Sequence, residues 1–152
     1  MGFLSYLINR DMTFNGVDIE DPTFQKKMFY NLIDKLNITY GSIDKEVNES
    51  NSEDYDGTIK EEIILIELTI NIYESYEDRL KRGNCIDTKM FLIDNLITKD
   101  SPDNLWNICY KKVKELIIAE YMHNIKENLN LSENDSIPSD LNYLITIDDH
   151  FN

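Results

Sequence analysis

The sequence has few of the residues that mark catalytic, metal-binding or secreted proteins. Its 152 residues include two cysteines, five glycines, three prolines and one alanine. Cys85 and Cys109 have no neighbouring Cys or His, so neither a zinc site nor a disulfide framework is expected. The glycines are not clustered, which excludes a phosphate-binding loop. The sequence therefore predicts a non-enzymatic protein that carries no metal and no cofactor.

Long apolar segments are also lacking. The longest uninterrupted aliphatic run is Ile63 to Ile66, far short of the roughly 20 residues that cross a bilayer as a helix. The apolar stretch at the start is interrupted by Arg10 and Asp11 and has no basic residue before it, unlike a signal peptide. These features predict a cytoplasmic protein that does not contact membranes.

Positive charge is scarce. The chain has 29 acidic and 15 basic residues, a net charge of −14 and a pI near 4.4. Such a surface repels phosphates, so direct binding to nucleic acid is not expected. Residues 42–57 hold six acids and one base, and residues 132–152 hold five acids and no base. Ten of the fourteen excess charges are therefore expected in one loop and one tail.

Isoleucine and asparagine are abundant, with 21 and 17 copies against one alanine and three valines. This bias indicates an AT-rich gene of bacterial, phage or viral origin, because Ile and Asn codons are rich in A and T. Hydrophobic residues make up 41% of the chain. That content and the length predict one folded domain over residues 1–152.

Apolar residues at intervals of three and four predict helices. Capping signals at Asp21-Pro22, Thr58, Asp87 and Ser101-Pro102 mark four helix starts, with a shorter helix expected at Phe3 to Asn9. The expected fold is all-α: a single-domain bundle of four to six helices around a long central helix at about 58–82. The acidic loop 42–57 and the acidic C-terminal tail lie outside it. The final stretch, 141–149, alternates weakly like a strand but has no evident partner. Six residues are expected in the core: Ile63, Ile66, Ile70, Trp106, Val113 and Leu116.

Residues Ser52 to Ile63 resemble the calcium loop of the EF-hand family. Asp54, Asp56 and Gly57 match its third, fifth and sixth positions. Ser52 replaces the first Asp, and Ile63 replaces the bidentate Glu that closes the loop. The resemblance implies a degenerate EF-hand-like calcium-binding protein, which is one alternative function.

A Glu-x-x-His step at Glu120 and His123 is typical of di-iron helix bundles. Those sites need a second such step, and the only other histidine is His150, in the tail. His123 is therefore expected to be an ordinary helix residue.

The acidic segments suggest a function. We expect a protein-binding inhibitor, of the immunity-protein or antitoxin type, that presents an acidic surface to a basic toxin or nucleic-acid-binding protein. The remaining alternative is a viral or phage helical modulator that binds a partner helix in a hydrophobic groove. The expected partner-binding residues are Asp44, Glu46, Glu49, Glu53, Asp54, Asp56, Asp148 and Asp149.

Overall fold

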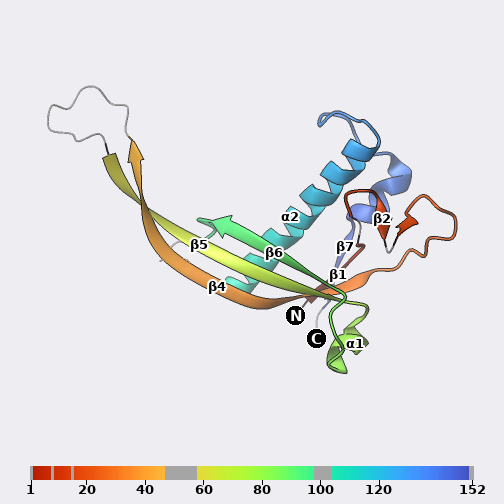
Figure 1. Ribbon diagram of the computed structural model, residues 1–152, viewed down its shortest axis with the longest axis horizontal. Coiled ribbons are helices and arrows are strands. Elements are labelled where there is room, and N and C mark those ends of the chain that lie inside the picture. Colours follow the sequence, from red (N-terminus) through yellow and green to blue (C-terminus); the bar gives the residue numbers. More distant parts are fainter. Residues whose placement is uncertain (1, 8, 15, 47–57, 98–103, 151–152) are drawn as a thin grey trace.

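A five-stranded antiparallel sheet, covered on one face by a long helix, forms the body of the protein (Figure 1). The computed structural model describes residues 2–7, 9–14, 16–46, 58–97 and 104–150. The strands lie in the order β6-β5-β4-β1-β7. Their bounds are β1 (Gly2–Ser5), β4 (Phe29–Glu46), β5 (Thr58–Tyr73), β6 (Asp87–Asp94) and β7 (Ile147–His150). The other elements are β2 (Thr13–Phe14), β3 (Val17–Asp18), α1 (Tyr76–Leu80), α2 (Leu105–Asn128) and the 3-10 helix η1 (Ser139–Ile145).

The prediction of an all-α bundle is wrong. The segment expected as the central helix, 58–82, is strand β5 followed by the single turn and a half of α1. Eight of the sixteen β5 residues are Ile or Thr, whose branched side chains favour strands. Apolar residues occupy so many β5 positions that helical and alternating spacings both fit, and only the pairing with β4 and β6 decides between them.

Three other expected helices are also strands. The helix expected after Asp21-Pro22 is replaced by strand β4, which begins at Phe29, and the helix expected from Asp87 is replaced by β6. β1 ends at Ser5, within the short helix expected at Phe3 to Asn9. The tail has the partner strand that the sequence did not reveal, because β7 pairs with β1. The fourth helix is confirmed as α2, although its N-cap is Asn104 rather than Ser101.

The β4–β5 hairpin dominates the sheet and curves around α2 (Figure 1). Its register shifts between Ile33 and Lys35, which marks a bulge. The Tyr110 hydroxyl on α2 accepts a hydrogen bond of 3.0 Å from the Ile33 N–H, a buried contact. A bulge leaves one residue unpaired and bends its strand. The helix therefore supplies a hydrogen-bond partner at the point where the ladder is interrupted.

The core lies between one sheet face and α2. Alternate β5 residues, Ile66, Leu68 and Ile70, are completely buried against helix residues such as Val113 and Ile117. Burial of Ile66, Ile70 and Val113 confirms three of the six predicted core residues. The other three do not reach full burial: the side chains of Ile63 and Leu116 are half-buried and Trp106 is 45% exposed.

Candidate functional site

The structure separates the predicted acidic residues instead of bringing them together. Asp44 lies near the far end of β4, the middle strand, whereas Asp148 and Asp149 lie on the edge strand β7, which is beside β1 at the other end of β4. Asp149 pairs with Phe3 on β1, and Phe3 pairs with Asn31 on β4. The thirteen residue-to-residue steps from Asn31 to Asp44 span about 43 Å of strand at roughly 3.3 Å each. Among the described residues, Asp44 and the two β7 aspartates therefore do not lie on one contiguous surface.

The two β7 aspartates are exposed, but one of them already has a cationic partner. The Asp149 carboxylate lies 2.6 Å from the ammonium of Lys114 on α2. This pair helps fix the edge strand to the helix. Asp149 is thus better explained as a structural residue than as a partner-binding one.

Four of the predicted binding residues, Glu49, Glu53, Asp54 and Asp56, lie outside the described residues. Glu46 is the last residue of β4, opposite Thr58, and its side chain is not among those described. The EF-hand resemblance also falls partly outside the described residues. Its second half, from Thr58, is strand β5, so the helix that follows a calcium loop is not formed there.

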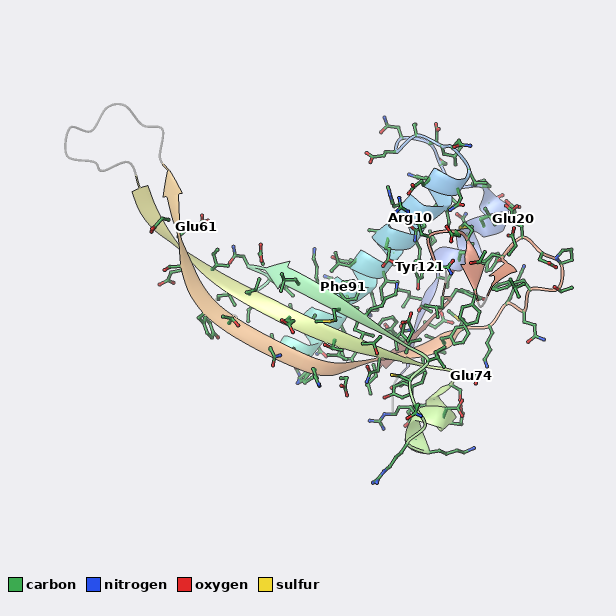
Figure 2. The ribbon with its side chains drawn as sticks, in the orientation of Figure 1. Arg10, Glu20, Glu61, Glu74, Phe91 and Tyr121 are labelled. Carbon is green, nitrogen blue, oxygen red and sulfur yellow. The ribbon has the colours of Figure 1, made fainter. Side chains whose placement is uncertain are left out.

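We call residues 40–64 the acidic arm; its described strands, 40–46 and 58–64, lie at the end of the β4–β5 ladder that is far from β1. β6 pairs with β5 only as far as Leu65 opposite Asp94, so the described parts of the arm, 40–46 and 58–64, form a two-stranded ribbon. Seven residues per strand extend it about 23 Å at roughly 3.3 Å each. Figure 2 shows Glu61 on this arm, far from Arg10 and Glu74.

The arm concentrates negative charge. Residues 40–64 contain eight acids and two bases, a net charge of −6 out of −14. Asp44, Glu61 and Glu62 are exposed on its described strands. Tyr40, at the base, is 60% exposed and borders a shallow hollow of about 300 Å³ that also involves Gly41 and Glu62. An exposed aromatic ring beside carboxylates is a surface that Lys and Arg side chains bind well.

A larger groove, which sequence reasoning missed, lies at the opposite end of the sheet. We call it the charged groove; its volume is about 820 Å³, and it runs between the β2–β3 hairpin, the start of β6 and the middle of α2. Its apolar part includes the ring pair Phe14 and Phe29, with centroids 4.7 Å apart. No local pattern predicts the groove, because its lining comes from five separate chain segments.

Ion pairs flank the charged groove. The Lys27 ammonium lies 2.8 Å from the Glu74 carboxylate, and the Lys89 ammonium lies 3.2 Å from both oxygens of Glu120. Lys89 also lies 5.0 Å from the centre of the Tyr121 ring. Each of these cations already has an anionic partner, so the groove has no concentrated charge with which to attract a polyanion.

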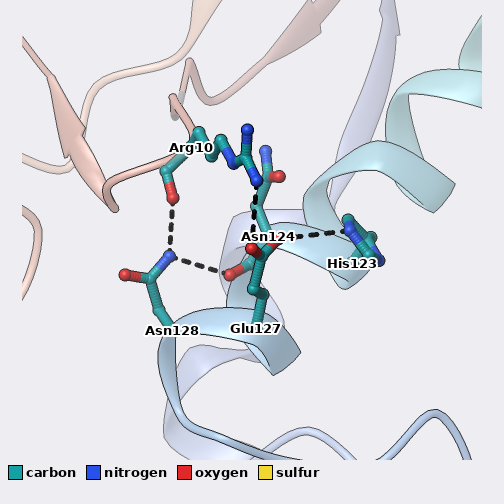
Figure 3. Close-up of polar contacts among 5 residues, drawn as sticks. All are labelled: Arg10, His123, Asn124, Glu127 and Asn128. Carbon is teal, nitrogen blue, oxygen red and sulfur yellow. Dashed lines mark hydrogen bonds and ion pairs between the residues drawn. The ribbon is translucent and has the colours of Figure 1, made fainter.

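A polar cluster on α2 holds Arg10, which also lines the charged groove (Figure 3). Glu127 accepts from the Arg10 guanidinium at 3.2 Å and lies 3.3 Å from His123. Asn128 donates to the Arg10 carbonyl at 2.6 Å and to the Asn124 carbonyl at 2.9 Å. The cluster fixes the N-terminal segment to the helix, and it gives His123 a structural contact.

Two potentially reactive side chains are buried in the core. Burial raises the pKa of the Cys109 thiol, and burial is also the main reason that the pKa of the Tyr110 hydroxyl is raised. Both groups therefore stay protonated near neutral pH, where neither is a nucleophile. Within the described ranges, no group of three or more His, Cys, Asp or Glu side chains is placed to hold a metal ion. No helix in the described part of the chain is long and apolar enough to cross a membrane.

Comparisons with known proteins give no relative. The sequence matches no model of a known protein family. It has no significant similarity to a curated protein. The structure has no significant match among solved structures.

Proposed function

We propose that this chain is a non-enzymatic protein-binding protein of the inhibitor or immunity type, which captures a basic protein through its acidic arm. The observation that carries the proposal is the arm itself: its described strands, 40–46 and 58–64, form a two-stranded ribbon, and the sequence over 40–64 has a net charge of −6. The proposal omits Asp148 and Asp149, because they lie at the other end of the sheet. The alternatives of a helical modulator and an EF-hand-like protein relied on helices at positions where strands form.

Electrostatics give the arm a physical advantage in binding. A concentrated negative potential steers a cationic partner and raises its association rate, by up to several orders of magnitude at low salt. A two-stranded ribbon in water is only marginally stable by itself. A partner that covers the arm would bury the exposed Tyr40 ring and the half-buried Ile63, and would thereby stabilise the ribbon.

A reducing, cytoplasmic location forms part of the proposal. Cys85 is half-buried and Cys109 is buried, and both are free thiols. Free thiols persist where glutathione and thioredoxin keep cysteines reduced. An intracellular toxin or a nucleic-acid-binding protein would be encountered in such a compartment.

The test compares two variants of equal net charge. The arm variant carries Asp44→Asn, Glu61→Gln and Glu62→Gln. The control variant carries Asp11→Asn, Glu20→Gln and Glu133→Gln, at exposed positions outside the arm. Each set removes three negative charges, so both variants have a net charge of −14 + 3 = −11.

Binding of a lysine-rich peptide to each immobilised protein is measured by surface plasmon resonance at low and moderate salt. The arm variant should associate about tenfold more slowly than wild type at low salt, whereas the control should stay within about twofold. Circular dichroism checks that both remain folded. Equal slowing in the two variants would show that only net charge matters, and the arm would then not be the binding surface.

A further inference from the structure

The β6 strand combines an outer sheet edge with exposed apolar side chains. Among the strands that the structure describes it is the outermost of the sheet, with β5 as its neighbour, so its other edge is free of described strands. Met90 and Leu92 are 67% and 66% exposed, the largest values among the large hydrophobic residues that the structure describes as exposed. They are two residues apart, so both lie on the sheet face opposite α2, while Phe91 between them packs against the core. Such an edge is a template for pairing with another strand.

The backbone of β6 is oriented for such pairing. The Asn95 N–H donates to the Ile64 carbonyl at 2.8 Å, which makes these two residues a hydrogen-bonded pair of the β5–β6 ladder. Hydrogen-bonded pairs alternate along an antiparallel ladder, so the odd-numbered residues of β6 bond to β5. The N–H and C=O groups of residues 88, 90, 92 and 94 therefore point to the free edge. Within the part of the chain that the structure describes, the Thr88 N–H has a local acceptor, the Asp87 carboxylate at 2.8 Å.

We propose that two copies of this chain associate through β6, antiparallel, about a two-fold axis at Phe91. This register places Met90 of each copy opposite Leu92 of the other, and Thr88 opposite Asp94. Met90 and Leu92 both direct their backbone groups outward, so each such pair exchanges two hydrogen bonds. Their side chains lie on the same face, so the most exposed apolar groups cover one another on both sides of the axis.

Neighbouring registers lack this self-complementarity. A shift by one residue places the outward-pointing backbone groups of one copy opposite inward-pointing groups of the other. It also puts side chains that face each other across the axis on opposite faces of the sheet. An axis at Met90 sets Leu92 opposite Thr88, and an axis at Leu92 sets Met90 opposite Asp94. The axis at Phe91 is the one among these that matches apolar with apolar and polar with polar.

Charge also favours β6 as the contact between copies. Each copy carries −14, but β6 has two acids and one base. In the antiparallel arrangement the two acidic arms extend in opposite directions. Each arm begins beyond Asp94, and the two Asp94 residues are six residues apart along the strands, about 20 Å at roughly 3.3 Å each. That separation exceeds the Debye length of about 8 Å at physiological salt, so repulsion between the arms is screened.

The first test measures oligomeric state by sedimentation velocity over a range of concentrations, for wild type, Leu92→Lys and Leu80→Lys. Leu80 is 53% exposed on α1, away from the sheet edge, so it is a matched control. Leu92→Lys should raise the dimer dissociation constant about tenfold or more, because an edge lysine opposes strand pairing at two places in the interface. Both variants change the net charge equally, from −14 to −14 + 1 = −13, so a nonspecific effect of weaker repulsion would strengthen association in both. A wild type that stays monomeric up to about 100 µM would overturn the proposal, as would a dimer that Leu92→Lys leaves intact.

The second test examines the register, in a Cys85→Ser background that retains the buried Cys109. Met90→Cys and Leu92→Cys proteins are oxidised separately and as a mixture. A hydrogen-bonded antiparallel pair has Cα atoms about 5.5 Å apart, which a disulfide can span. The mixture should form cross-linked dimers, and neither protein alone should do so to a comparable extent. Cross-linking of Met90→Cys alone as strong as in the mixture would overturn the axis at Phe91.

Discussion

Alanine substitutions along β5 test the strand directly, because they distinguish alternation from helical spacing. In the structure Leu68 is completely buried under α2, whereas Ile63 is half-buried on the other face. Leu68→Ala should therefore cost about 2–5 kcal/mol of unfolding free energy, through lost burial and the cavity left behind. Ile63→Ala should cost about 1 kcal/mol or less.

A helix over the same residues would reverse the order. Ile63, Ile66 and Ile70 would share one face at 100° per residue, and Leu68 would lie about 160–200° away from Ile66 and Ile70. Ile66 and Ile70 are buried in either geometry, so their substitution does not discriminate. The contrast between Ile63 and Leu68 carries the test.

The assay is urea unfolding followed by circular dichroism. With a slope of about 2 kcal/mol per molar urea, a loss of about 3 kcal/mol lowers the midpoint by about 1.5 M. If Leu68→Ala does not fold, the milder Ile70→Val, expected to cost about 0.5–1.5 kcal/mol, calibrates the core. Equal losses at Ile63 and Leu68, or a larger loss at Ile63, would refute the strand assignment.

Four further predictions follow from single contacts. Tyr110→Phe removes the acceptor for the Ile33 N–H and should cost about 1–3 kcal/mol in urea unfolding; an unchanged midpoint would contradict that bond. The pKa values of Cys109 and Tyr110 are raised above their ordinary 9.0 and 10.0, so the stability that these two groups contribute is present below about pH 9. The free energy of unfolding should decline as the pH rises through the folded-state pKa values, and it should decline less steeply in Tyr110→Phe. Iodoacetamide should modify half-buried Cys85 before buried Cys109, as read by peptide mass spectrometry, and simultaneous modification would contradict the burial. Gly2→Ala should lower the melting temperature, since its Cβ would lie 2.5 Å from the Tyr30 ring, whereas Gly41→Ala meets nothing within 4 Å and should not.

Local sequence signals located the elements better than they identified their type. Segment starts at Thr58, Asp87 and the 101–104 region correspond to β5, β6 and α2. Thr58 to Glu61 has the form of a capping box, but here Thr58 simply begins a strand. The side-chain pattern of β5 fits a helix and a strand, and long-range pairing with β4 selects the strand. A prediction that gave more weight to the branched Ile and Thr side chains would have favoured the strand.

Pairings between distant segments could not be inferred from the sequence. β1 and β7 are four residues each and nearly the whole chain apart, yet they pair along their length. The same limit applies to the site. Charge counts predicted an acidic loop at 42–57, but residues 42–46 are part of strand β4, and the sheet order shows that they and the β7 aspartates lie at opposite ends.

The distribution of charge and apolar surface gives the two sheet edges different roles. β7 presents Asp148 and Asp149 at its edge, and charged edge residues oppose pairing with another strand. The negative charge of the acidic arm opposes the approach of a second copy of a chain that carries −14, and under the proposed function it would attract a basic protein. On β6 the two acids, Asp87 and Asp94, lie at the strand ends and Lys89 is paired with Glu120, so Met90 and Leu92 form the middle of the outer face. The same negative charge that would select a basic partner at the arm therefore leaves β6 as the edge through which two copies can approach.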